Sequence, residues 1–428
     1  MKRPPKARGP VQSGITRREA VSGAALLGIG AGLDRVLSGP LGSGARTSGP
    51  ASSANSTVPF HGAHQAGIAT PPQSYLHFAA FDLADASVSD LRSLLQRWTT
   101  AAALLTSGRL YETVSQQPDE NPEDTGEALG LGPSQLTLTF GFGPGLFGSP
   151  GRNPLVPAPR RPTELAELPP FKGERLDAAR SGGDLCVQAC ADDPQVAFHA
   201  IHVLSRVAAG TAAPRWSQLG FGPVSSAGRS HSTPRNLMGF KDGTDNINVG
   251  DAAAMGQFVW VKAGDGPGWM VDGTYLVLRR IRMLFDVWDA TSLDGQERVI
   301  GRYKLSGAPL GERNEFDTAD LTAISAGAPT IPANAHIRLA DPENNSGQRI
   351  LRRGYSYSEG TEAGAGQIDA GLFFIAFQRS PRRQFIPLQS RLAASDALNQ
   401  HTLHTTSAIF ACPPGVRSGG FIGEALFD

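Results

Sequence analysis

Two cations, two acids and two glycines lie close together at positions 235–246, in the segment RNLMGFKDGTDN. Taken alone, Asp242-Gly243 is typical of a turn, because aspartate bonds its own backbone and glycine tolerates positive φ angles. A chemical interpretation is also open. Gly239 and Gly243 would let the backbone approach a flat ligand, while Asp242 presents a carboxylate that can move a proton.

A histidine and an arginine pair form the second group. His336 stands in AHIRLA, and Arg352-Arg353 stands in RILRRGYSY. A single histidine beside apolar residues is most often structural or exposed, and adjacent arginines are usually a solvated pair. If the segment is extended, the two arginine side chains point to opposite faces, so that only one can face a given cavity.

Taken together, the two segments resemble the dye-decolourising peroxidases, a haem family marked by a GxxDG motif. Here that motif is Gly239-Phe240-Lys241-Asp242-Gly243. Further matches are FHGAHQAGI at 60–68, GDLC at 183–186 and QIDAGLFF at 367–374. The resemblance extends from about residue 59 to the C-terminus, and the subgroup that looks most similar is the exported deferrochelatase/peroxidase branch.

The resemblance implies a haem b cofactor (iron protoporphyrin IX). His336 is the implied axial ligand of the haem iron, and Asp369 is the acid expected to hold its other ring N–H. Asp242 and Arg352 are the implied catalytic pair on the opposite face. Arg353 is the alternative candidate for the catalytic arginine. If Arg352 has that role, Arg353 is expected to contact a haem propionate or an acid. The motif also implies cofactor-binding roles for Gly239, Phe240, Lys241, Gly243 and Thr244.

The implied function is that of a haem peroxidase that reduces hydrogen peroxide and oxidises dyes, phenols or other one-electron donors, small or bulky. Asp242 would transfer the peroxide proton and Arg352 would stabilise the charge that develops as the O–O bond breaks. An aspartate is ordinarily ionised above a pH of about 3.9, so we expect an acidic pH optimum, which burial would move upward. The alternatives are a haem-binding protein that releases iron from haem, and a binding module without activity.

The first 50 residues predict an export signal of the twin-arginine type, with a linker. Arg17-Arg18 follows a basic start and precedes the apolar run 21–33, which is too short and too rich in glycine to span a bilayer. The stretch 36–58 is mostly Ser, Gly, Ala and Pro, as in a flexible linker. We therefore expect the mature protein outside the cell or in the cell envelope.

Charge and hydropathy exclude two classes of partner. Residues 1–50 hold eight Lys or Arg and two Asp or Glu, and subtracting these from totals of 39 and 39 leaves 31 basic and 37 acidic residues. This net charge near −6 argues against a nucleic-acid partner, which would favour a basic face. No later stretch is apolar enough to span a membrane, so we expect no membrane-spanning segment in the mature protein. A homo-oligomer is compatible with the sequence.

The order of elements predicts an α+β fold. Strands are expected at 75–83, 135–142, 184–191, 274–285, 371–378 and 408–411, and helices at 89–107, 193–209, 291–300 and, in part, 385–392. Ser89 or Asp90 would cap the first helix. The second half repeats the plan of the first, which predicts two ferredoxin-like halves with antiparallel sheets and flanking helices, at 51–225 and 226–428. The resemblance implies the same architecture, a dimeric α+β barrel-like superfamily with haem in the second half.

The three cysteines predict no disulfide. Cys186 and Cys190 share a face of the expected strand but stand too far apart along it to be bridged. An odd number of cysteines also gives no framework of pairs. We expect buried free thiols, including Cys412.

Overall fold

The computed structural model describes residues 53–112, 118–122, 124–148, 154–224, 233–361 and 366–428. The twin-arginine segment lies outside the described residues, as does the predicted boundary at 225/226. Residues 50–428 form one compact unit. No helix among the described residues is long and apolar enough to cross a membrane.

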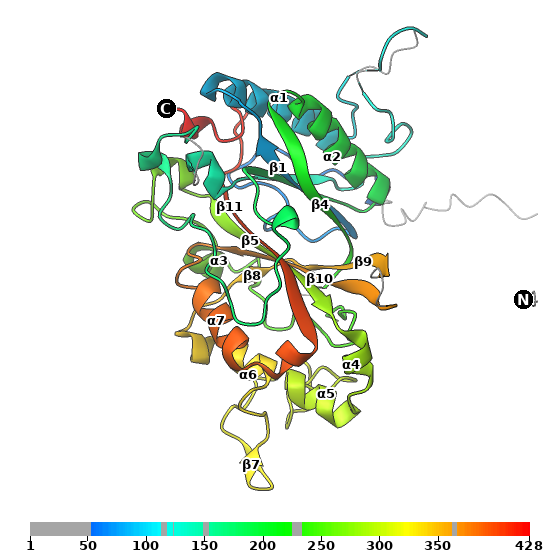
Figure 1. Cartoon of the computed structure of the whole chain (residues 1–428), viewed down its shortest axis with the longest axis vertical. Coiled ribbons are helices and arrows are strands. Elements are labelled where there is room, and N and C mark those ends of the chain that lie inside the picture. Colours follow the sequence, from blue (N-terminus) through cyan, green and yellow to red (C-terminus); the bar gives the residue numbers. More distant parts are fainter. Residues whose placement is uncertain (1–52, 113–117, 123, 149–153, 225–232, 362–365) are drawn as a thin grey trace, which may run out of the picture. The chain divides into compact units, whose positions relative to one another are not determined.

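The first half folds in the order strand, helix, strand, strand, helix, strand. Its elements are β1 (Tyr75–Leu83), α1 (Val88–Thr106), β2 (Thr137–Phe142), β3 (Leu185–Ala191), α2 (Pro194–Ala208) and β4 (Ala212–Pro223). The strands pair antiparallel in the spatial order β4-β1-β3-β2. This is the ferredoxin-like arrangement, with α1 and α2 side by side on the sheet (Figure 1).

The second half repeats that arrangement with insertions. Its elements are α3 (Ala252–Phe258), β5 (Thr274–Met283), α4 (Phe285–Asp289), α5 (Leu293–Ile300), β6 (Ile324–Ser325), β7 (Ala328–Pro329), α6 (His336–Ala340), β8 (Leu351–Arg352), β9 (Tyr355–Thr361), β10 (Ile368–Gln378), α7 (Phe385–Ser395) and β11 (Thr402–Cys412). The four long strands lie in the order β11-β5-β10-β9, the counterpart of the order in the first half.

The two halves share a single sheet that closes on itself. The outer strand β4 of the first half pairs with β9 of the second, and the outer strand β2 pairs with β11. Closure removes the exposed strand edges that each half would have alone. The prediction of two ferredoxin-like α+β halves is therefore confirmed as architecture, and both halves belong to one compact unit.

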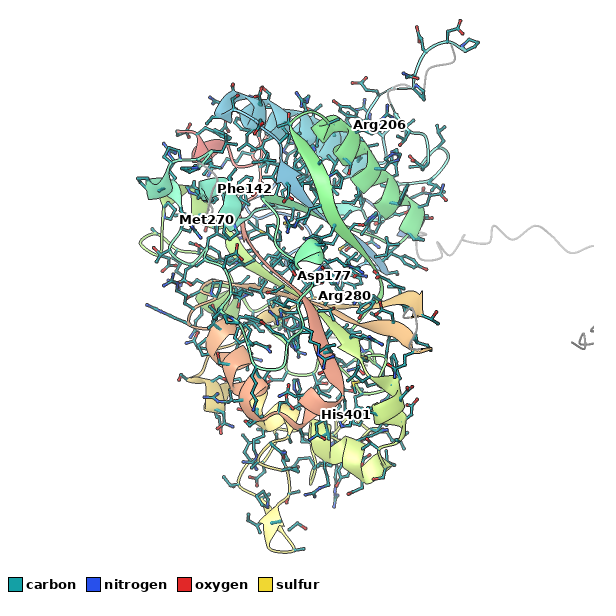
Figure 2. The ribbon with its side chains drawn as sticks, in the orientation of Figure 1. Phe142, Asp177, Arg206, Met270, Arg280 and His401 are labelled. Carbon is teal, nitrogen blue, oxygen red and sulfur yellow. The ribbon has the colours of Figure 1, made fainter. Side chains whose placement is uncertain are left out.

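Two large apolar clusters fill the molecule. One lies between the sheet and the helices α1 and α2 and extends to α7, and the other gathers the side chains that face the inside of the closed sheet. Figure 2 shows side chains throughout both halves, from Phe142 on β2 to His401 before β11. Cys186, Cys190 and Cys412 belong to the inner cluster and are free, as the sequence predicts. Burial raises the pKa of each thiol, which keeps all three protonated and inert.

The cap of α1 differs from the prediction. The N-cap is Ser87, whose hydroxyl accepts from the backbone N–H of Asp90, while the Asp90 carboxylate accepts from the backbone N–H of Ser87. This reciprocal pair is a capping box, so the acid expected as the cap is its third helical residue. Ser89 lies inside the first turn.

Candidate active site

The loop that carries Asp242 is built by Asn236 and two glycines. The side-chain oxygen of Asn236 accepts from the backbone N–H groups of Met238 and Phe240, at 3.0 and 3.3 Å. Gly239 has φ +84° and Gly243 has φ +130°, values that a side chain would strain. The turn that the sequence predicts therefore exists, and it places the Asp242 carboxylate at a defined position.

Arg352 holds that carboxylate. Its Nη1 donates to Oδ1 of Asp242 at 2.8 Å, and its Nη2 donates to the carbonyl of Thr244 at 3.0 Å. Asn246 fixes the arginine's backbone, because its side chain both donates to the Arg352 carbonyl and accepts from the Arg352 N–H. The side chains of Asp242 and Arg352 are 18 % and 26 % exposed, so the pair is shielded but still accessible.

His336 begins the short helix α6, and its ring is fixed from behind. Nδ1 lies 2.6 Å from Oδ2 of Asp396, whose other oxygen accepts from the backbone N–H of Leu398. Asp396 ends α7 and is almost fully buried, whereas the imidazole is 36 % exposed. Because a carboxylate oxygen accepts, Nδ1 carries the hydrogen and Nε2 carries the lone pair in the neutral ring. No described residue bonds to Nε2.

Two opposing influences act on the pKa of His336. Burial lowers the pKa, but the charge of Asp396 and its hydrogen bond raise it by more, so the net shift is upward. The charge of Asp242 adds to the rise, and that of Arg352 opposes it. The histidine, the acid and the arginine are therefore close enough to interact electrostatically.

A small apolar cluster joins the segments that carry Asp242, His336 and Asp396. Its centre contains Met238 and Phe240 from the Asp242 loop, Trp288 from α4 and Ile300 from α5. Packed against it are Ile337, next to His336, Leu398, next to the Asp396 turn, and Leu372 of β10. The segments are far apart in sequence, so it is this packing, more than local structure, that brings the site together.

The predicted partner of His336 was wrong. Asp369 lies at the start of β10, and its Oδ2 accepts from Nη2 of Arg280 at 2.7 Å. Arg280 also stacks over the ring of Tyr357 at 4.1 Å, on the inner side of the sheet. Asp369 therefore balances a buried cation, and Asp396 takes the role that the sequence analysis assigned to Asp369.

The predicted role of Arg353 was also wrong. This side chain is fully buried on the opposite face from Arg352, as the alternation of an extended segment requires. It donates to the carbonyls of Thr70 and Pro71 and to the side chain of Gln73. Arg353 therefore holds the segment before β1 in place and forms no ion pair with an acid in the described part of the chain.

The other residues of the GxxDG motif support the loop. Phe240 is buried against the Trp288 ring, with centroids 5.8 Å apart. Lys241 forms an ion pair with Glu315, and the Thr244 hydroxyl donates to the same carboxylate. The side chains of Lys241 and Thr244 are thus engaged with protein, and direct contact of Gly239 and Gly243 with a cofactor stays a prediction.

Asp396 and Asn246 are the site residues that sequence reasoning missed. Asp396 lies 60 positions from His336, in a segment that reads as an ordinary helix end. Asn246 closes the motif segment itself, so its position beside Asp242 was available as a signal. Its bonds to the backbone of Arg352 depend on a long-range approach that spacing does not reveal.

The site segments fall within two family models. Residues 65–222 match the model described as "Dyp-type peroxidase, N-terminal", and residues 233–417 match "Dyp-type peroxidase, C-terminal". The boundary between the two models agrees with the change from the first half of the fold to the second.

Individual proteins give the same result. The "Dye-decolorizing peroxidase" of Thermobifida fusca is 41% identical over 381 residues, 86% of this chain and 84% of that protein. The "Deferrochelatase" of Escherichia coli K12 is 35% identical over 378 residues, 87% of this chain and 88% of that protein. Ferric DtpA from Streptomyces lividans superposes with a TM-score of 0.78 at 41% identity, over 87% of this chain and 97% of that one. This chain therefore belongs to the DyP-type peroxidase family and is an enzyme of that family.

Proposed function

We propose that this enzyme binds haem b at His336, reduces hydrogen peroxide there and oxidises one-electron donors such as dyes or phenols. The observation that carries the proposal is the arrangement of three side chains. An imidazole with a free Nε2 interacts electrostatically with a carboxylate and a guanidinium that are bonded to each other. The similar solved structures of DtpA from Streptomyces lividans, which are described as ferric and oxyferrous, support an iron cofactor.

The residues present fit such a group. Nε2 of His336 is available as an axial ligand, and the Nδ1–H donated to Asp396 increases the electron density of the ring. Leu372 of β10 is partly exposed beside the site and offers an apolar contact for a flat macrocycle. No group of three or more metal-binding side chains occurs among the described residues, whereas iron in a porphyrin needs only one protein ligand.

Asp242 and Arg352 divide the handling of the peroxide. Oδ1 of Asp242 is bonded to Arg352, while Oδ2 receives, from the described residues, only a 3.3 Å contact from Asn236 and is the freer oxygen. We assign to Oδ2 the removal of the proton from one peroxide oxygen and its return to the oxygen that leaves as water. Arg352 stabilises the negative charge that develops on the leaving oxygen. Bound haem iron would supply the electrons that break the O–O bond.

The test replaces the acid without removing the loop. In the haem-loaded Asp242→Asn variant, we expect the rate of the reaction with hydrogen peroxide to fall by about 10²- to 10⁴-fold, as for loss of a general base. Stopped-flow absorption at the Soret band measures it. Asp245→Asn is the matched control, because its carboxylate lies in the same loop, is 58 % exposed and pairs with Arg349. A peroxide rate in Asp242→Asn equal to that of the control would refute the assignment.

A second function is favoured by the relatives named deferrochelatase, which are 35% identical to this chain. In that case the same axial ligand would hold haem while iron is released. Incubating the haem-loaded protein with a ferrous chelator and reductant separates the two functions. Recovery of iron-free porphyrin would support the second function, whereas retained iron with rapid peroxide turnover supports the first.

We further propose that Arg17-Arg18 directs export of the folded, haem-loaded enzyme to the cell envelope or the exterior. The support is the sequence of residues 1–33, with its basic start, arginine pair and apolar run. Replacing both arginines by lysine should block export, so that the peroxidase activity stays inside the cell. Unchanged activity outside the cytoplasm in that variant would contradict this proposal.

A further inference from the structure

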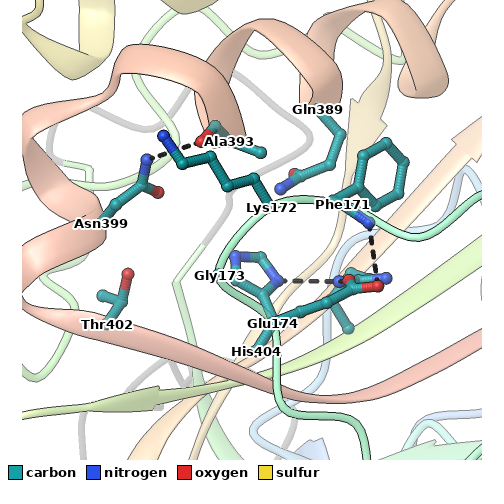
Figure 3. Close-up of a pocket in the computed structure, with 10 residues that line it drawn as sticks. Phe171, Lys172, Gly173, Glu174, Gln389, Ala393, Asn399, Thr402 and His404 are labelled. Carbon is teal, nitrogen blue, oxygen red and sulfur yellow. Dashed lines mark hydrogen bonds and ion pairs between the residues drawn. The ribbon is translucent and has the colours of Figure 1, made fainter.

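A polar pocket lies between α7 and the sheet, apart from Asp242, His336 and Arg352. The loop 171–174 forms one wall, α7 another, and β5 and β11 the floor, around a small hollow that opens to solvent. Figure 3 shows the side chains of Lys172, Gln389 and His404 around it, with Lys172 extending toward Asn399. The pocket shares no residue with the site proposed above.

The floor is a fixed set of polar groups. The Arg279 guanidinium forms a buried ion pair with Glu174 and donates from Nη1 to Ser407 at 2.8 Å. Its Nε donates to Nδ1 of His404 at 3.2 Å. Because Nδ1 accepts, the hydrogen of the neutral ring is on Nε2, and no described residue accepts it. His404 therefore offers the pocket an N–H donor.

The protonation of His404 is consistent with that geometry. Burial lowers the pKa of His404, and the charge of Arg279 lowers it further, to about 3. The ring stays neutral at physiological pH, so its donor does not depend on titration.

The remaining walls add donors without matching acceptors. Gln389 is 7 % exposed, and no described residue bonds to its carboxamide. The amide lines the hollow, where a bound group can replace water as its hydrogen-bond partner. Lys172 is exposed at the edge of the pocket, and its ammonium forms no ion pair with a described residue. Since Arg279 and Glu174 neutralise each other, Lys172 leaves the pocket with one net positive charge.

We infer that this pocket binds a small organic carboxylate, held by Lys172, the Gln389 amide and the His404 Nε2–H. One negative charge matches the single uncompensated cation, and two carboxylate oxygens can accept from the Gln389 and His404 donors together. Phe171 and Ala393 also line the pocket, and its open side leaves room for the apolar body of an organic acid, which an inorganic anion lacks.

The experiment is a calorimetric titration of the haem-loaded protein with benzoate, and with benzamide as the uncharged analogue. We expect one benzoate per chain, with benzamide at least about tenfold weaker. Lys172→Met should weaken benzoate binding by about three- to tenfold, and Gln389→Leu by a similar factor, with thermal melting to show that both variants are folded. Lys262→Met is the matched control, an exposed lysine outside the pocket.

Three results would overturn the inference. Absence of benzoate binding would do so directly. Binding of unchanged affinity in Lys172→Met and Gln389→Leu would place the benzoate elsewhere, for instance beside Arg352. Binding seen in haem-free protein only would show that the cofactor itself occupies the pocket.

Discussion

At the scale of single residues, the function of each charged side chain depends on what it is paired with. Asp396 and Asp369 are both acids of the second half, but one holds an imidazole at 2.6 Å and the other holds a guanidinium at 2.7 Å. Arg352 and Arg353 are adjacent, yet one meets a carboxylate in a shielded, accessible site and the other is buried among carbonyls. Residue type alone predicts neither distinction.

The role of Asp396 can be tested against that of Asp369. Asp396→Asn keeps an oxygen able to accept from the Leu398 N–H but removes the negative charge behind His336. We expect affinity for haem iron or peroxidase activity to fall by about 10- to 100-fold, and the iron reduction potential to rise, because the axial ring becomes a weaker donor. Haem titration measures the affinity, and spectroelectrochemistry measures the reduction potential. Asp369→Asn should leave the reduction potential of the iron unchanged. If the potential shifted in Asp369→Asn and not in Asp396→Asn, Asp369 would be the partner of His336, as the sequence predicted.

At the scale of elements, segments with a continuous apolar run were predictable from the sequence, and segments interrupted by proline and glycine were not. The strand at 75–83 was predicted with the bounds of β1, because a run of apolar residues ends at a polar turn. Strand β4 escaped prediction, since it contains Pro214, Gly220 and Gly222 and exposes more than half of its residues. Its identity as a strand depends on pairing with β1, which a linear pattern does not contain.

Helix α2 carries an acid-sensitive contact between two histidines and a glutamate. Oε2 of Glu127 lies 2.8 Å from Nδ1 of His199, and its Oε1 lies 2.6 Å from Nδ1 of His202. Thr125 donates to the same carboxylate, and the buried carboxyl of Asp124 lies on the other side of His199. Burial raises the pKa of Glu127, but the bonds from Thr125 and the two histidines lower it by more, to about 2.

A lowered folded-state pKa means that Glu127 stabilises the fold above its unfolded pKa of about 4.5 and loses that contribution as the pH falls toward about 2. We expect Glu127→Gln to lower the free energy of unfolding at pH 7 by about 2 kcal/mol, allowing for its partial exposure. The difference from wild type should shrink below pH 4.5. Denaturant unfolding across pH measures this, with the exposed Glu167→Gln as control. A difference that does not change with pH would contradict the assigned pKa.

At the scale of the whole molecule, the closed sheet explains both the stability of the fold and the position of the site. The repeated order of strands was predictable from the pattern of elements, because each half carries its own strands and helices. Closure of the sheet was not predictable. Strand β4 pairs with β9, and β2 with β11, through only a few residue pairs that are distant in sequence. The site depends on the same kind of long-range approach: apolar packing joins segments near residues 242, 336 and 396, and a hydrogen bond to Asp242 adds Arg352.

Closure gives a prediction about dissection. Residues 53–224 or 233–428, expressed alone, would each leave two strand edges and part of the inner apolar cluster exposed. We expect either fragment to be aggregated or unfolded, and the two to recover a folded complex when co-expressed. Circular dichroism and size-exclusion chromatography measure this. A soluble, cooperatively unfolding fragment would show that each half is an independent domain.

The proposed function requires that His336 bind haem iron opposite Asp242 and Arg352. Its most direct test is the absorption spectrum of purified, haem-supplied protein beside that of His336→Ala, each before and after one equivalent of hydrogen peroxide. We predict a Soret band in the wild type that changes rapidly with peroxide, and in the variant a weakened or shifted band that does not. A folded wild type without a Soret band, or a variant with the wild-type spectrum and peroxide response, would contradict it.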